Sequence, residues 1–370
     1  MELVALAVAL AVALAAALVA LVLTPLVRGA ALKIGFVDKP GERKIHTAPI
    51  AYGGGVAVAL AMTVVLAAAA AVPIVSAFFS QPALGKELRG AVLIAVAAGA
   101  CGMLLLGLLD DRYRLSPWTK LAAQFVVAIA TVASGVRITA FIGDTLVMRA
   151  ATVLWIVLIT NSFNLLDNMD GLCSGTAAIA AGILSFLALE SRQWGLALAT
   201  AALAGACLGF LRYNRAPATI FLGDAGSLLV GYLMACFTAL VTYYHKNQPN
   251  PAAIGIPLLI LAIPLYDTFS VILIRFRERR PLMRGDTSHF SHRLVDLGMT
   301  RREAVATILL ACLAIGLPAT TLRQLSPAHG FLIIGHSILV LAIVALLERA
   351  GRNRARQAEE KPQMNTDEHR

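Results

Sequence analysis

The sequence predicts an all-α fold, a polytopic bundle of transmembrane helices. Of its 370 residues, 59% are hydrophobic and only 14% are charged, whereas a soluble domain carries about 25% charged residues. The mean hydropathy is correspondingly high, at +0.78. In addition, apolar runs long enough to cross a bilayer, which takes about 20 residues, recur along most of the chain. A membrane protein with many crossings is therefore expected.

Eleven apolar runs qualify as spans. Ten is the alternative count, because the fifth and sixth runs are the least clearly separate crossings. In chain order the runs are residues 3–27, 54–78, 90–109, 119–136, 147–163, 175–190, 194–211, 226–244, 252–274, 303–322 and 329–348.

The two ends of the chain receive different predictions. The first run, Leu3–Val27, has no basic region before it and is longer than the core of a cleavable signal peptide, so we expect a retained helix. The last residues, from Arg349, are polar and charged, which is typical of disorder. We therefore divide the chain into an integral membrane domain, residues 1–348, and a disordered cytoplasmic tail, residues 349–370.

Basic residues predict the orientation. With the amino terminus outside and eleven alternating spans, 24 of the 31 Lys and Arg residues fall in inside loops or the C-terminal tail. Positive charge marks the cytoplasmic side, so we expect a multi-pass protein of the plasma (inner) membrane with its C-terminus in the cytoplasm. The same loops explain the net charge of +10 without a nucleic acid as partner. The five cysteines are scattered singly, which argues against disulfides and zinc.

The most informative polar segment is residues 161–172, NSFNLLDNMDGL, which places two carboxylates and three carboxamides between two apolar runs. Charge is costly near lipid. In a helix, Asp167 and Asp170 would share one face, and they would repel each other unless a cation lay between them. Hard oxygen ligands suit Mg²⁺, with Mn²⁺ as an alternative. The competing interpretation is a polar loop whose side chains cap the backbone.

Two more acidic motifs lie in loops predicted to be on the same side. Asp110 and Asp111 end an apolar helix, where the helix dipole disfavours anions. They could chelate a metal or supply a general base, or simply be neutralised by Arg112 and Arg114. Asp224 has glycines on both sides just before an apolar run, which fits close contact with a ligand, an N-cap, or both.

Basic groups accompany the acids in these inside loops. Lys44 and His46 precede three consecutive glycines, an arrangement that fits a phosphate-binding rim as well as a membrane anchor. His289, His292 and Arg293 could bind a diphosphate, although a histidine pair is often incidental. Aspartates and basic groups on one cytoplasmic face are what Mg²⁺-dependent chemistry on a diphosphate needs. The membrane setting implies that one substrate is a lipid.

Taken together, these motifs give the chain a family resemblance. It resembles the polyprenyl-phosphate N-acetylhexosamine-1-phosphate transferases of glycosyltransferase family 4, in particular those that attach GlcNAc-1-phosphate to undecaprenyl phosphate; the phospho-N-acetylmuramoyl-pentapeptide transferases are related. The resemblance extends from about Asp38 to Leu294. The matching motifs are Asp38-x-Pro40-x-x-Arg43-Lys44-x-His46, Gly54-Gly55, Asp110-Asp111, Asn161-x-x-Asn164-x-x-Asp167-x-x-Asp170-Gly171, Phe221-x-Gly223-Asp224-x-Gly226-Ser227 and Asp286-x-x-His289-x-x-His292-Arg293-Leu294.

The resemblance implies transfer of a sugar-1-phosphate, most simply GlcNAc-1-phosphate, from a UDP-sugar to a polyprenyl phosphate, releasing UMP and starting a cell-envelope glycan. It assigns Mg²⁺ to Asp167, with Asp224 and Asp170 nearby. Direct attack by the lipid phosphate with Asp111 as base is our mechanistic interpretation, and a covalent aspartyl-phosphate is the alternative. Substrate contacts are implied for Lys44, His46, Asn161, Asn164, His289, His292 and Arg293, and a role at the metal or the lipid phosphate for Asp110.

Two departures from the family pattern bear on the donor sugar. Ser291 stands where the family often has a histidine, and Ala51-Tyr52 stands where it often has Pro-Arg. A UDP-MurNAc-pentapeptide or another UDP-N-acetylhexosamine is therefore the alternative donor. From other classes, a transporter of anionic metabolites would place its charges at broken helices in paired repeats, and a non-catalytic scaffold would need no intact set of aspartates. A homodimer is compatible with the sequence but not indicated by it.

Overall fold

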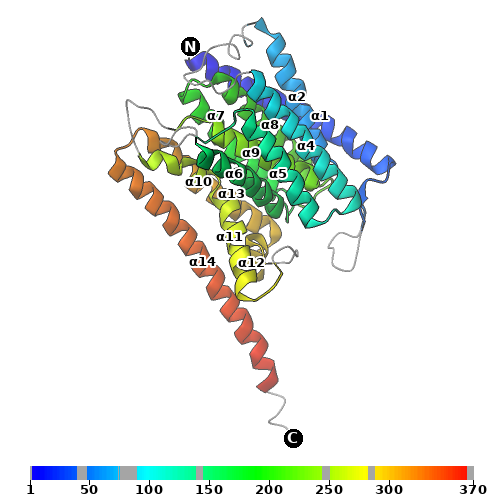
Figure 1. Cartoon of the computed structure of the whole chain (residues 1–370). Coiled ribbons are helices and arrows are strands. Elements are labelled where there is room, and N and C mark those ends of the chain that lie inside the picture. Colours follow the sequence, from blue (N-terminus) through cyan, green and yellow to red (C-terminus); the bar gives the residue numbers. More distant parts are fainter. Residues whose placement is uncertain are drawn as a thin grey trace.

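The computed structural model describes residues 2–39, 48–73, 75, 90–138, 145–243, 251–281 and 288–364, with side chains described as far as residue 349. The described chain is almost entirely helical (Figure 1). Its helices are α1 Glu2–Lys33, α2 Gly54–Ala71, α4 Gly90–Tyr113, α5 Pro117–Ala133, α6 Leu146–Leu166, α7 Leu172–Glu190, α8 Trp194–Asn214, α9 Gly223–Leu240, α10 Ile256–Ile260, α11 Ala262–Arg277, α12 Phe290–Asp296, α13 Arg301–Ala319 and α14 Pro327–Met364. Two 3-10 turns, η1 Pro251–Gly255 and η2 Thr320–Arg323, and two strands, β1 Val37–Asp38 and β2 Ile50–Ala51, complete it.

The predicted all-α membrane bundle is confirmed. Within the described ranges, nine helices are long and apolar enough to cross a membrane, and a tenth span is formed if Pro251–Ile260 and α11, which meet at 73°, count as one. The fourth expected run, residues 119–136, accounts for the difference from eleven: it forms α5, whose 17 residues rise only about 26 Å, less than the roughly 30 Å of a bilayer core. The fifth and sixth runs form two separate helices, α6 and α7. The last helix, α14, continues beyond residue 348 to Met364.

Small residues allow the helices to pack closely. α7, α8 and α9 are the most buried of the long helices, whereas α1 and α14 are the least buried and lie at the periphery (Figure 1). A Cβ on Gly205 or Gly209 of α8 would lie 1.9 Å from the Ala13 carbonyl oxygen or 2.2 Å from that of Ala17. Glycine is therefore required for α1 to pack against α8, as is common between membrane helices.

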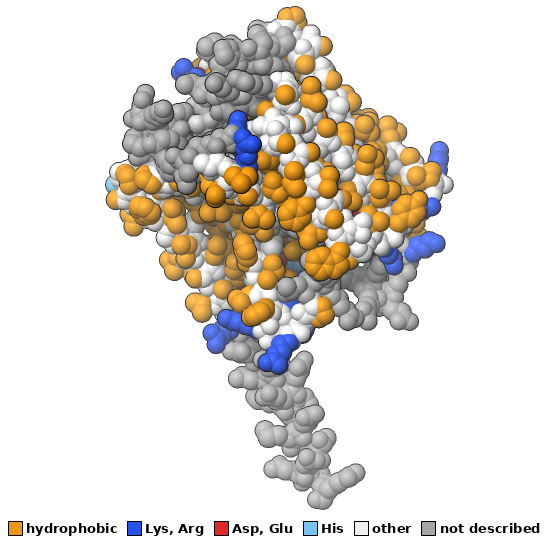
Figure 2. Space-filling view, viewed as in Figure 1, with side chains coloured by type: hydrophobic (Ala, Val, Ile, Leu, Met, Phe, Trp, Pro, Cys, Tyr) orange, Lys and Arg blue, Asp and Glu red, His pale blue; other side chains and the backbone are white. Residues whose placement is uncertain are grey.

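The surface has the distribution expected in a bilayer. Figure 2 shows hydrophobic side chains over most of the visible face of the bundle, with Lys and Arg side chains mainly at its lower and right-hand margins and a few near its upper end. An apolar surface this extensive is suited to lipid, and basic side chains accumulate where the lipid ends. The chain is a multi-pass membrane protein.

Loops from distant parts of the sequence are joined at one end of the bundle. β1 pairs antiparallel with β2, and β2 continues by a bridge between Ala51 and Ile220. The backbone N–H groups of Gly54 and Gly55, which begin α2, donate to the carbonyls of Phe221 and Leu222, at 3.0 and 3.1 Å. These bonds hold the start of α2 against the start of α9, where the acidic motifs meet.

Candidate functional site

A pocket of about 480 Å³ lies at this end of the bundle. Five aspartates line it, contributed by β1, α4, the α6–α7 connection and α9. The lining residues are Asp38, Ile50, Tyr52, Asp111, Asp167, Asn168, Met169, Asp170, Asn214, Ala216, Pro217, Ala218, Phe221, Gly223, Asp224, Arg301 and Val305. The structure therefore brings four of the five aspartates given a site role in the sequence into one pocket, together with Asp38, which the sequence analysis named only as part of a motif.

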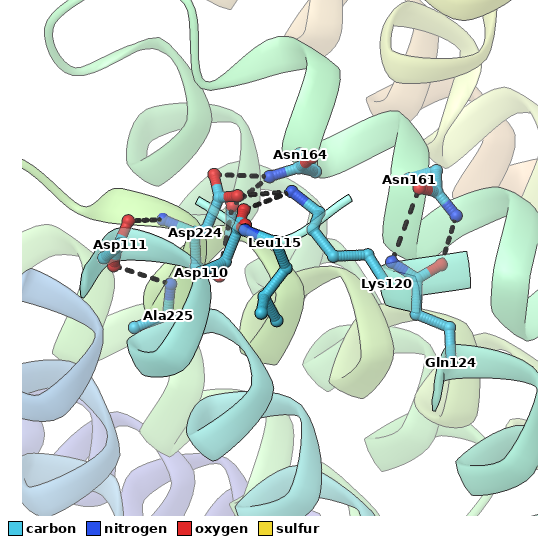
Figure 3. Close-up of polar contacts among 10 residues, drawn as sticks. Asp110, Asp111, Leu115, Lys120, Gln124, Asn161, Asn164, Asp224 and Ala225 are labelled. Atoms are coloured by element: carbon cyan, nitrogen blue, oxygen red, sulfur yellow. Dashed lines mark hydrogen bonds and ion pairs between the residues drawn. The ribbon is translucent and has the colours of Figure 1, made fainter. Parts of the chain in front are cut away.

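Asp111 joins α4 to the first turn of α9. Its carboxylate accepts hydrogen bonds from the backbone N–H groups of Asp224 and Ala225, at 2.9 and 3.1 Å (Figure 3). The first N–H groups of a helix need an acceptor, and no side chain at the start of α9 supplies one. The N-cap considered for Asp224 is thus supplied by Asp111, leaving the Asp224 carboxylate free of that role. Gly223 makes the approach feasible, since its φ is +73° and a Cβ would lie 2.6 Å from an Asp111 oxygen.

Lys120, at the start of α5, links two of the acids. Its Nζ lies 2.6 Å from Asp110 Oδ2 and 2.5 Å from Asp224 Oδ2 (Figure 3). The other Asp224 oxygen accepts a 2.9 Å hydrogen bond from Asn164 Nδ2. Neither Asp110 nor Lys120 lines the pocket; Lys120 links Asp110 to the lining residue Asp224. Sequence reasoning treated Lys120 only as a topological charge, because a single lysine before an apolar run carries no sign of its partners.

Replacing Lys120 with Met is expected to lower the free energy of unfolding by about 1–3 kcal/mol, because two partly buried carboxylates lose their charged donor. Adding Asp110→Asn removes one of the two uncompensated charges, so the double variant should recover part of that loss. Denaturation of the four proteins in detergent measures the coupling as a double-mutant cycle. Strictly additive effects would show that Lys120 and Asp110 act independently.

Asp167 ends α6 and is half-buried in the pocket. Burial raises the pKa of its carboxyl well above the ordinary value, and the charges of Asp224, Asp111 and Asp170 raise it further. Its neighbour Asp170 is tied to the pocket wall, where its Oδ2 accepts a 2.9 Å hydrogen bond from the Ala218 N–H. A carboxylate held among other carboxylates is a group whose charge a bound cation would stabilise.

The side chains of this pocket are of the type that binds a magnesium ion. Among the residues that the structure describes, no three His, Cys, Asp or Glu side chains already stand in a metal-binding arrangement. However, Asp111, Asp167 and Asp224 line one pocket, and Lys120 already places a positive charge against Asp224. Carboxylate oxygens are the ligands that Mg²⁺ prefers, usually one or two of them together with substrate phosphates and water.

The amides of residues 161–168 have different surroundings. Asn161 faces Gln124 of α5, with its Nδ2 2.5 Å from Gln124 Oε1 (Figure 3), and it is not among the residues that line the pocket. Asn168 lines the pocket; its Nδ2 donates to the Leu165 carbonyl at 2.7 Å, and its Oδ1 accepts a hydrogen bond from Ser291 Oγ.

Both positions that depart from the resemblance therefore lie at the pocket. Ser291 contacts it through Asn168, and Tyr52 lines it directly. The Tyr52 ring stands between two other rings, with centroid distances of 5.7 Å to Phe36 and 6.2 Å to Phe221. Burial raises the pKa of the Tyr52 hydroxyl, and the neighbouring carboxylate of Asp38 raises it further, so Tyr52 adds a neutral aromatic side chain to a wall that also contains Asp38.

Two of the predicted substrate ligands are paired with buried acids. His289 Nδ1 lies 2.9 Å from Asp267 Oδ2 of α11. Arg293 Nε lies 2.9 Å from Glu348 Oε2 of α14. Neither His289 nor Arg293 lines the pocket, so the structure does not bring them to the aspartates.

The remaining basic candidates are Lys44, His46 and His292. Lys44 and His46 lie outside the described residues. His292 is half-buried on α12, and its pKa is lowered by burial and by the nearby charges of His289 and Arg301, against the opposing effect of Asp296 and Asp267.

The lowered pKa of His292 predicts a loss of stability in mild acid. A histidine with a folded pKa below its unfolded value of about 6.5 binds its proton more readily when unfolded. The contribution of His292 to stability is therefore fully present above about pH 6.5 and declines as the pH falls. Thermal unfolding from about pH 8 to pH 5 should show a shallower decline for His292→Gln than for the wild type and for the exposed control His329→Gln; equal declines in all three would contradict this assignment.

Comparison with known proteins provides independent information. A family model described as glycosyl transferase family 4 matches residues 93–242. The chain is 32% identical over 333 residues to a probable undecaprenyl-phosphate N-acetylglucosaminyl 1-phosphate transferase of Bacillus subtilis, covering 88% of each chain. It is 29% identical to a decaprenyl-phosphate N-acetylglucosaminephosphotransferase of Mycolicibacterium smegmatis, over 88% of this chain and 84% of the relative. It is 26% identical to an undecaprenyl-phosphate alpha-N-acetylglucosaminyl 1-phosphate transferase of Escherichia coli, over 77% and 76%.

Proposed function

The chain belongs to glycosyl transferase family 4, and from this premise we propose that it transfers GlcNAc-1-phosphate from UDP-GlcNAc to undecaprenyl phosphate, forming the first lipid-linked intermediate of a cell-envelope glycan. It is a membrane-embedded phosphotransferase. The observation that carries the proposal is the pocket in which Asp111, Asp167 and Asp224 meet at one end of a transmembrane bundle. Such a site serves a reaction between a membrane lipid and a water-soluble diphosphate.

The reaction is a displacement at phosphorus. An oxygen of the lipid phosphate attacks the β-phosphorus of the UDP-sugar, and the bond from that phosphorus to the bridging oxygen breaks. UMP leaves with the electron pair, and the sugar-phosphate becomes part of a new lipid diphosphate. We propose that Asp111 accepts the proton of a lipid phosphate that arrives protonated. A covalent aspartyl-phosphate is the competing route, and it would predict exchange of labelled UMP into the donor in the absence of lipid.

Magnesium is our proposed cofactor, with Mn²⁺ as a substitute. Asp167 and Asp224 would hold the ion, with Asp170 nearby, and the bound ion would neutralise phosphate oxygens and stabilise the departing charge. Asn164 orients Asp224 through its 2.9 Å hydrogen bond. We propose that Asp110 is a positioning residue that acts through Lys120, since it contacts that side chain at 2.6 Å. The raised pKa of Asp167 supports cation binding, because burial and the charges of Asp224, Asp111 and Asp170 disfavour an ionised carboxylate that a bound cation would stabilise.

The remaining assignments also belong to this proposal. Lys44, His46 and His292 would contact the donor, whereas His289 and Arg293 would do so only if they left their buried partners. The excess of basic residues in alternate loops supports an inner-membrane protein with its pocket open to the cytoplasm and its N-terminus outside. A transporter is not favoured, since the aspartates lie at helix ends. Tyr52 and Ser291 depart from the family pattern at the pocket, so the identity of the donor sugar is the part of this proposal that most needs a direct test.

A defined assay tests the function. Purified protein is incubated with Mg²⁺, undecaprenyl phosphate and a panel of labelled UDP-sugars, and UMP release is measured together with label in the lipid phase. UDP-GlcNAc is expected to give both products in equal amounts, and EDTA is expected to stop the reaction. UMP without lipid-linked label would indicate hydrolysis, and a preference for another UDP-sugar would correct the donor. Absence of both products with every donor would overturn the proposed function.

A further inference from the structure

Arg301 differs in charge from the other ionisable residues of the pocket. Among the described residues that line it, five are aspartates, and Arg301 is the single Lys, Arg or His. Sequence reasoning gave Arg301 no role beyond the charge of an inside loop. A pocket lined by carboxylates alone would repel a phosphorylated substrate. Arg301 is therefore the described lining residue whose charge would attract one.

The first turn of α13 directs Arg301 toward the pocket. Val305, four residues later on the same face of the helix, lines the pocket as well. The start of the helix is fixed by a capping box in which the Thr300 N–H donates to Glu303 Oε2 at 2.7 Å and the Glu303 N–H donates to Thr300 Oγ1 at 3.3 Å. The backbone that carries Arg301 is therefore ordered, although its side chain is exposed.

The Arg301 guanidinium is not committed to a carboxylate. Within the described part of the chain, no Asp or Glu oxygen lies within the 4.0 Å of an ion pair with it. Other basic side chains of the described chain have fixed partners, either a carboxylate or a backbone carbonyl. Arg302 donates to the Ala216 carbonyl at 3.0 Å, Lys120 is held by two aspartates, and Arg293 is held by Glu348.

We propose that Arg301 binds a phosphate group of a substrate in this pocket, a contact that rests on the proposed function. A guanidinium presents a planar set of N–H donors that matches two phosphate oxygens at once. The phosphate belongs either to the nucleotide-sugar diphosphate or to the lipid acceptor. In both cases Arg301 supplies the pocket with attraction for an anion, while the aspartates serve the cation. Neutralisation of the aspartates alone would instead place Arg301 in ion pairs with them.

The proposal is tested by the steady-state kinetics of Arg301→Gln, measured once with the concentration of UDP-GlcNAc varied and once with that of undecaprenyl phosphate varied. Loss of one charge-assisted contact is expected to raise the KM of the substrate that Arg301 binds by about 10- to 100-fold, with a smaller change for the other substrate. A rise confined to the donor assigns the diphosphate, and a rise confined to the acceptor assigns the lipid phosphate. Arg301→Lys should be intermediate, since lysine keeps the charge but not the paired donors.

A charge-matched control separates a contact from a general loss of positive potential. Arg277→Gln, at the exposed end of α11 and outside the pocket, should leave both KM values within about twofold of the wild type. Unchanged KM values in Arg301→Gln, or equal changes in both arginine variants, would overturn the proposal while wild-type activity still upheld the proposed function. If Arg301→Gln does not purify in folded form, Arg301→Met, which keeps the apolar stem, is measured in its place with the same outcomes.

Discussion

Replacing Asp167 with Asn is expected to lower kcat by at least about 10²- to 10³-fold, the size of losing one preorganised electrostatic contact to the transition state. The substitution keeps the shape of the side chain and the hydrogen bond from the residue 167 backbone N–H to the Phe163 carbonyl at the end of α6. It removes a carboxylate that burial and other acids disfavour. The variant should therefore fold, and without metal it should be at least as heat-stable as the wild type.

Thermal unfolding with and without Mg²⁺ gives this prediction a readout besides activity. Mg²⁺ should raise the melting temperature of the wild type, and of the exposed control Asp296→Asn, more than that of Asp167→Asn, because a ligand stabilises only the state that binds it. Full turnover in Asp167→Asn would remove Asp167 from the metal site. Failure of the variant to fold would make its role structural.

Replacing Gly107 with Ala is expected to destabilise the protein by about 1–3 kcal/mol or more, the usual cost of overpacking, and to reduce activity. In a free helix the same change would stabilise by about 1 kcal/mol. Here the new Cβ would lie 2.3 Å from the Ala225 Cα and from the Asp224 carbonyl oxygen. α4 would have to move away from α9, and Asp111, one turn beyond Gly107 on the same face, would lose its hold on the α9 amides.

The same helix offers a matched control. Among the described residues, a Cβ on Gly102 would meet only Val127 Cγ2 within 4 Å, at 3.4 Å, so Gly102→Ala should leave stability and turnover close to those of the wild type. Denaturation in detergent and the transfer assay compare the two variants. Equal behaviour of Gly102→Ala and Gly107→Ala would show that the contact between α4 and α9 is not what limits the space at residue 107.

Much of the architecture could be predicted from sequence because its cause is local. Each of the eleven apolar runs contains a helix, since a long stretch of Ala, Leu and Val is stable in lipid only when its backbone bonds are made within the segment. The same reasoning placed Asp110 and Asp111 at the end of a helix and Asp224 just before one. The shared helix face considered for Asp167 and Asp170 is not formed, because α6 ends at Leu166 and both residues lie in the connection to α7. Where local reasoning had no pattern to use, it failed to foresee the 73° bend before α11 and the shortness of α5.

Only the tertiary structure decided which of these groups meet. Asp111 accepts hydrogen bonds from amides 113 and 114 residues away in the sequence, and Lys120 contacts Asp224 over 104 residues. The helices between them have similar apolar compositions, so the sequence does not indicate which helices pack together. For the same reason the sequence could not show that His289 and Arg293 are held by Asp267 and Glu348, or that Arg301 lines the pocket. The length of the apolar runs determines that the chain crosses the membrane, and the charge of the loops determines on which side of it the acidic residues lie. Close helix packing, set by glycines such as Gly107, determines which acids share a site.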